Sequence, residues 1–151
     1  MRRPSSGQPV VLDANVLKEW FLRLETPACR LAQELHESCV EFRYSNELAR
    51  EAHSAIHRHG SPIRRETLTR FFGAADSKLG RVAQSKLDQV QLPASVRERL
   101  PQEDIHVVKL AVACRARCLV TRDGPLHESL MAVVDLLKLP SVHPELSPFD
   151  D

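Results

Sequence analysis

The sequence has few features of a membrane, secreted or metal-stabilised protein. Its uninterrupted apolar runs span only a few residues, whereas a membrane helix needs about 20. The first nine residues, MRRPSSGQP, contain no apolar core of the kind found in a signal peptide. The four cysteines form no CxxC pair, which favours buried free thiols over a zinc site. We therefore expect a cytoplasmic protein without a membrane segment.

Size and net charge do not point to a particular ligand. A chain of 151 residues with 42% hydrophobic and 27% charged residues is typical of one domain, and it can fold without a structural metal. The net charge of +1 argues neither for nor against nucleic acid. Seven basic residues and three acidic ones lie between His57 and Asp88, namely Arg58, Arg64, Arg65, Arg70, Lys78, Arg81 and Lys86 against Glu66, Asp76 and Asp88. This segment is either a solvated helical face or a surface that contacts phosphates.

Apolar strands alternate with helical patterns along the chain. Strands are expected at 9–12, 39–44, 119–120 and around 141–143, and helices at 16–24, 27–37, 46–59, from about 103 to 114 and at 126–139. Residues 63–100 are predicted to be helical but broken by Gly73, Gly80 and Pro93. This order predicts an α/β protein with three layers, in which helices cover both faces of a mostly parallel sheet of four or five strands. We expect a flexible arm at 1–8, a single domain at 9–145 and a loose tail at 146–151.

Four acidic residues stand where the predicted elements begin or end. Asp13 and Asp123 follow apolar strands, Asp104 opens a helix, and Glu51 lies on the second turn of the helix that Ser45 caps. The carboxyl ends of parallel strands meet at one edge of the sheet, so the four side chains can converge there. Each acid alone could be a helix cap, a turn residue or a solvated charge. Together they predict a shared site, because crowded carboxylates repel unless a cation balances them.

Mg²⁺ or Mn²⁺ would suit such a site. These hard ions prefer oxygen ligands and retain water. They can activate a bound water and stabilise the charge that develops on an attacked phosphate. The acidic residues therefore predict metal-dependent hydrolysis of a phosphodiester.

Four stretches of the chain resemble the PIN domain family. They are VVLDANVL at 10–17, SNELARE at 45–51, DIHVVKLA at 104–111 and LVTRD at 119–123. The resemblance implies an endoribonuclease that cuts single-stranded RNA with a divalent metal, as in the VapC-like toxins of bacterial toxin–antitoxin pairs. It implies that Asp13, Glu51, Asp104 and Asp123 are the acidic ligands and that Asn15 and Thr121 orient them. Two residues depart from the family pattern, since Ala14 often corresponds to a hydroxyl residue and Arg122 often to a glycine.

The sequence also predicts contacts to substrate and to partners, in less detail. Arg58, Arg64, Arg65 and Arg122 are the candidate contacts to single-stranded or structured RNA. The resemblance implies an antitoxin protein as a partner, and a homodimer is also expected.

Two other functions are compatible with these residues. One is a PIN-like module that binds RNA or protein without cutting, which the presence of all four acids argues against. The other is a receiver-type phosphoacceptor domain, which would carry an acidic neighbour beside Asp13. His53 and His57 have the HxxxH spacing of a zinc site but no evident third ligand, so surface or RNA-contacting histidines are favoured. Trp20 and Phe21 are expected in the core or at a partner contact rather than as platforms for bases.

Overall fold

A parallel sheet forms the centre of the computed structural model, which describes residues 4–60, 62–72, 80–137 and 142–144. Strands β1 (Pro9–Leu12), β2 (Glu41–Phe42), β3 (Cys118–Thr121) and β4 (Val142–Pro144) lie in the order β2-β1-β3-β4, and every pairing is parallel. Val10 is aligned with Phe42 on one side and with Cys118 on the other. The predicted α/β class and parallel sheet are confirmed.

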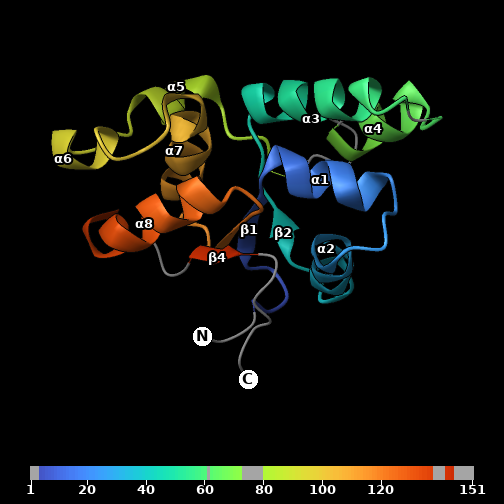
Figure 1. The fold of residues 1–151 in the computed structure, drawn as a ribbon, viewed down its shortest axis with the longest axis horizontal. Coiled ribbons are helices and arrows are strands. Elements are labelled where there is room, and N and C mark those ends of the chain that lie inside the picture. Colours follow the sequence, from blue (N-terminus) through green and yellow to red (C-terminus); the bar gives the residue numbers. More distant parts are fainter. Residues whose placement is uncertain (1–3, 61, 73–79, 138–141, 145–151) are drawn as a thin grey trace.

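Helices cover both sides of this sheet (Figure 1). On one side are α1 (Ala14–Phe21), α2 (Pro27–Glu37), α3 (Asn46–Arg58) and α4 (Arg65–Phe72). On the other side are α5 (Gln84–Asp88), α6 (Ala94–Arg97), α7 (Ile105–Ala113) and α8 (Gly124–Leu137), and a 3₁₀ turn at Gln102–Asp104 precedes α7. The strands are apolar on both faces because both faces are covered, and Val10, Val11 and Val120 are fully buried.

Side-chain caps explain where three helices begin: α2 and α3 start at the predicted residues, and α1 starts at Ala14, two residues before the predicted start at 16. The side chain of Asp13 accepts a hydrogen bond from the Ala14 N–H at the start of α1. Thr26 and Ser45 accept from the N–H groups of Cys29 and Leu48 in the same way. Each cap satisfies one of the amide groups that a helix leaves without a partner at its first turn. Local chemistry thus fixes the start of α1, which follows Asp13, and the start of α3, which carries Glu51.

Strand β2 is shorter than the predicted strand at 39–44. Cys39 has a left-handed backbone conformation with φ of 58°, so the extended strand cannot start there. Tyr44 leaves the sheet and pairs instead with the segment around Arg81, where its N–H donates to the Gly80 carbonyl at 3.1 Å. A side chain at Gly80 would overlap the guanidinium of Arg43. A contact between distant segments therefore ends the strand.

The remaining differences lie in the middle and at the ends of the chain. The predicted broken helical segment at 63–100 contains the short helices α4, α5 and α6, and residues 61 and 73–79 lie outside the described part. Residues 4–8 form a turn in which the Gly7 N–H donates to the Cys39 carbonyl at 3.0 Å. The tail at 146–151 and residues 1–3 lie outside the described residues. No helix in the part that the structure describes is long and apolar enough to cross a membrane.

Candidate active site

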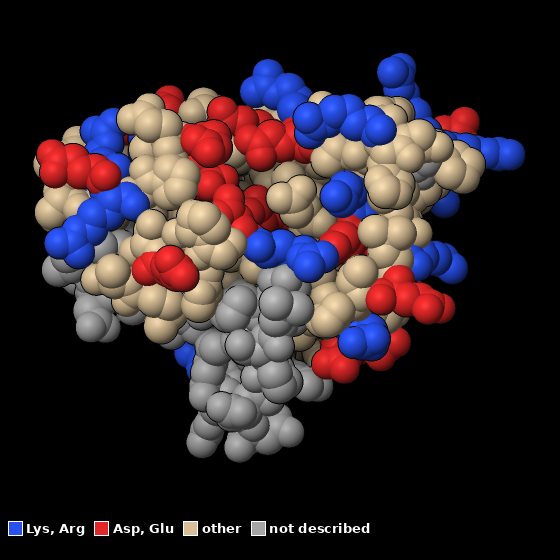
Figure 2. Space-filling view, viewed as in Figure 1, with Lys and Arg blue, Asp and Glu red and all other residues tan. Residues whose placement is uncertain are grey.

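An acidic cavity of about 470 Å³ lies where the carboxyl ends of β1 and β3 meet the helices. The structure brings Asp13, Glu51, Asp104 and Asp123 together in its wall. Figure 2 shows the same feature as a band of Asp and Glu side chains across the middle of the face, with Lys and Arg side chains on either side. Four segments that are far apart in the sequence thus supply carboxylates to one hollow. We call it the acidic cavity.

Asp13 is held in the floor of this cavity by two hydrogen bonds. One carboxylate oxygen accepts the Ala14 N–H at 2.8 Å, and the other accepts the Thr121 hydroxyl at 2.8 Å. The Asp13 residue is 5% exposed, and this burial raises the pKa of its carboxyl group above 3.8, although the hydrogen bonds from Thr121 and Ala14 oppose the rise. Asp13 is therefore both the cap of α1 and a fixed acidic group of the cavity.

Thr121 connects Asp13 to Asp123. Its hydroxyl group donates a hydrogen bond to the Asp13 carboxylate, and the hydroxyl oxygen accepts one from the Asp123 N–H at 3.0 Å. The Asp123 carboxylate in turn accepts the Leu126 N–H at 2.9 Å and so caps α8. The helix begins two residues before the predicted start at 126 because this cap and Gly124–Pro125 complete its first turn. Thr121, which the resemblance assigned an orienting role, is placed to orient two acids at once.

Asp104 is the acid of the site whose carboxyl pKa is raised furthest. It is 9% exposed, and one of its carboxylate oxygens is buried without a hydrogen-bond partner. Burial, followed by the negative charges of Asp13 and Asp123, raises the pKa of Asp104 from 3.8 to about 7. A carboxylate under this repulsion has an open coordination position and a strong preference for a neighbouring cation.

Glu51 faces the cavity but is shared with a histidine of α7. The Nε2 atom of His106 lies 2.5 Å from a Glu51 oxygen, and its Nδ1 atom lies 3.4 Å from a Glu47 oxygen. His106 thus stands between two acids that are one helical turn apart on α3. No local sequence pattern predicts this contact, because it joins α3 to α7 across the fold.

The predicted arginines are not all at the cavity. Arg58 lines it, as does Asn15, one of the two predicted orienting residues. Arg64 and Arg65 are exposed and are not among the residues that line it. Arg122 donates to the carboxylate of Glu19, an acid of α1 that is only 5% exposed. In this structure Arg122 therefore connects the loop that carries Asp123 to α1, rather than standing free for RNA.

Two further polar residues of the wall were not predicted. Glu103 and Ser54 also line the acidic cavity. Glu103 precedes Asp104 in the sequence, so the acidic pair at 103–104 was the available signal. Ser54 lies three residues after Glu51 on α3, which places both on the same face of the helix. The cavity therefore contains a fifth carboxylate.

The carboxylates could supply some, but not all, of the ligands of a hard cation. Among the described residues no three acidic, histidine or cysteine side chains come close enough to hold one ion by themselves. Mg²⁺ commonly binds to one or two carboxylates and completes its shell with water and substrate phosphate. The unpartnered oxygen of Asp104 and its charged neighbours match that type of site. His53 stacks on His57, with ring centroids 6.4 Å apart, and also packs against Phe72 at 5.6 Å.

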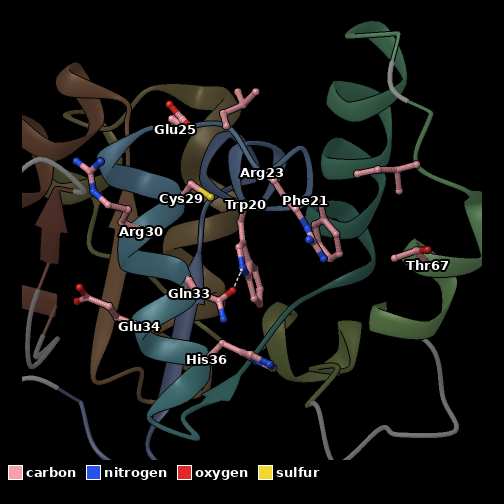
Figure 3. Close-up of a pocket in the computed structure, with 12 residues that line it drawn as sticks. Trp20, Phe21, Arg23, Glu25, Cys29, Arg30, Gln33, Glu34, His36 and Thr67 are labelled. Atoms are coloured by element: carbon pink, nitrogen blue, oxygen red, sulfur yellow. Dashed lines mark hydrogen bonds between the residues drawn. The ribbon is translucent and has the colours of Figure 1, made fainter.

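A larger cavity of about 1140 Å³ lies away from the acids, between α1, α2 and α4. Figure 3 shows Trp20 in this cavity, with its indole N–H directed at Gln33, to whose side-chain oxygen it donates at 3.0 Å. Trp20 also packs against Phe21, Phe42 and Phe71, with ring centroids 5.3 to 5.6 Å apart. None of the four predicted acids lines this cavity, so its size does not make it the reaction centre.

The acidic cavity lies at the carboxyl edge of the parallel sheet, where open α/β folds bind their ligands. A PIN domain family model matches residues 9–124, which is more than half of the chain and includes all four predicted acids. The chain therefore belongs to the PIN domain family. PIN domains are generally nucleases that use divalent metals. No curated protein and no solved structure matches the chain.

Proposed function

We propose that this PIN domain is a divalent-metal-dependent endoribonuclease that cuts single-stranded RNA. The observation that carries the proposal is the convergence of Asp13, Glu51, Asp104 and Asp123 in one cavity, where the pKa of Asp104 rises to about 7. Burial of this carboxyl group beside other acids destabilises the fold, and a bound cation would offset that cost.

Asp13, Asp104 and Asp123 would hold the ion, and Glu51 would complete the acidic set. When bound, Mg²⁺ or Mn²⁺ supplies an activated water and offsets the charge that develops on the attacked phosphate. The Thr121 hydroxyl keeps Asp13 in place and its oxygen accepts the Asp123 N–H. His106 holds Glu51 from the side of α7. These contacts fix carboxylates before substrate arrives, which preorganises the site.

The biological role we propose is that of a toxin in a toxin–antitoxin pair acting in the cytoplasm. The support is the resemblance of the four sequence stretches to such toxins, together with a cavity whose charge favours a cationic partner segment. A partner arginine would form charge-assisted hydrogen bonds with the carboxylates. We also propose a homodimer.

Cleavage of labelled single-stranded RNA by the purified chain tests the nuclease proposal. The chain is assayed with manganese, with magnesium and with chelator, beside the variant Asp104→Asn, which removes no helix cap. The control is Glu66→Gln, which alters an exposed acid on α4 outside the cavity. We expect metal-dependent cutting in the wild type and the control and none in Asp104→Asn. A folded wild type that binds metal and RNA without cutting would instead be a binding module, and the proposal would be wrong.

A further inference from the structure

A second hollow adjoins the acidic cavity. It has a volume of about 380 Å³ and lies between α3, α5, α6 and α7. The two hollows share Glu103. His106 marks the boundary between them, because it contacts Glu51 in the first and Glu47 in the second. The reaction assigned to the acidic cavity does not use this second hollow.

Helix α3 forms a common wall of the two hollows. Glu47 lines the second hollow, and Glu51, Ser54 and Arg58 line the acidic cavity. Their spacings of four, three and four residues place all of them on one face of the helix. Eleven residues at 1.5 Å each extend about 16 Å. Successive phosphates of a helically stacked strand are about 3.4 Å apart along its axis, so this wall is long enough for several of them. We call the two hollows together the α3 groove.

Basic side chains stand at both ends of the α3 groove. Arg58 lies at the acidic end, and Arg97 and Lys109 line the second hollow. Elsewhere, Arg43 pairs with Glu41, and Arg122 pairs with Glu19. By contrast, Arg58, Arg97 and Lys109 form no ion pair with any acid in the described part of the chain. Their charges are therefore available to a ligand, even though acids line the groove between them.

Uncharged groups in the second hollow suit unpaired bases. The exposed side chains of Gln84 and Gln102 offer amide groups for hydrogen bonds, and the partly exposed Ile105 offers apolar surface. Proteins recognise single-stranded RNA through such contacts to splayed bases, combined with basic groups for the phosphates. A duplex would keep its base edges paired and would leave these groups unused.

We propose that single-stranded RNA lies along the α3 groove, so that the segment on one side of the cut phosphate occupies the second hollow and contacts Lys109 and Arg97. Arg58 contacts the strand at the other end. This inference rests on the proposed function, because it takes the acidic cavity as the place of cutting. It assigns a substrate subsite to a hollow outside the four acids.

The test measures how strongly RNA binding depends on salt. A fluorescently labelled single-stranded RNA is titrated with the full chain in calcium, a hard cation with looser coordination geometry than magnesium, and electrophoresis confirms that the RNA stays intact. The double variant Arg97→Ala, Lys109→Ala is compared with Arg99→Ala, Lys86→Ala, whose residues are exposed but line neither hollow. Each lost contact to a single strand lowers the slope of log K against log salt by about 0.7.

We expect the slope of the groove variant to be shallower than that of the wild type by about 1.4, and the control variant to keep the wild-type slope. In the cleavage assay the groove variant should raise KM and leave kcat unchanged. A wild-type slope in the groove variant, or no binding of RNA by the wild type, would overturn the subsite. Cutting with an unchanged slope would reject the subsite alone. A changed slope without cutting would support the subsite and reject the nuclease.

Discussion

Replacing Asp104 by Asn should stabilise the protein when no metal is bound. A rise in the pKa of Asp104 from 3.8 to about 7 corresponds to about 4 kcal/mol, at 1.36 kcal/mol for each pKa unit. The folded state retains the Asp104 proton across this interval and the unfolded state does not, so the free energy of unfolding falls as pH rises from 3.8 to about 7. Asn has no charge to lose and removes this dependence.

The comparison is made at two pH values with chelator present. Between about pH 5 and about pH 8 the wild type should lose up to about 3 kcal/mol more stability than Asp104→Asn, because about two pH units of that interval lie below the raised pKa of Asp104. Screening by water in the open cavity reduces the value. At about 2–4 °C for each kcal/mol in a chain of this size, thermal unfolding monitored by circular dichroism resolves the difference.

Manganese should remove most of the stability advantage of Asp104→Asn. An ion at about 100 times its Kd stabilises the wild type by about 2.7 kcal/mol, and Asp104→Asn should gain much less because it lacks a ligand. If Asp104→Asn is less stable than the wild type at about pH 8 without metal, or if the difference between the proteins does not change with pH, then Asp104 is not under the repulsion inferred from its neighbours and the reasoning is refuted.

Three further substitutions test contacts that build the site. Thr121→Val removes the hydroxyl that donates to Asp13, so we expect a loss of about 1–3 kcal/mol in urea unfolding and weaker manganese binding, whereas Thr121→Ser should retain both; unchanged manganese binding in the Val variant would contradict the orienting role. Glu19→Gln removes the negative charge that Arg122 contacts, and because Arg122 is partly exposed we expect a loss of about 1–2 kcal/mol, below the range for a fully buried pair; no loss would show that this contact does not stabilise the fold. Ser45→Ala removes the cap of α3 and should lower the melting temperature by an amount equivalent to about 1 kcal/mol, and a melting temperature equal to that of the wild type would count against the cap.

Local patterns were sufficient to predict several elements. Strand β1 and helix α2 have the predicted bounds, Pro9–Leu12 and Pro27–Glu37. In both cases the signal lies within the element itself, as a short apolar run or as a helical period with Thr26 and Pro27 at its start. The early start of α8 at Gly124 comes from the Asp123 cap, which is also a local signal. The apolar pattern alone begins only at Leu126.

Contacts between distant segments could not be predicted in the same way. Arg122 was expected to contact RNA, but its partner Glu19 lies 103 residues away in the sequence. His106 meets Glu51 because α3 and α7 pack side by side. The convergence of the acids was easier to anticipate, since parallel strands bring their carboxyl ends to one edge whatever the side chains are. The sheet topology was therefore more informative for predicting the site than the individual residue types were.

The capping role of Asp13 determines how an inert form of the protein should be made. Its carboxylate holds the first turn of α1 and the Thr121 hydroxyl as well as lining the cavity. Any substitution there mixes loss of chemistry with loosening of a helix that packs on α2 and α3. Asp104 makes no capping hydrogen bond with its side chain. For a well-folded variant that lacks one acid of the cavity, Asp104 is therefore a better position to change than Asp13.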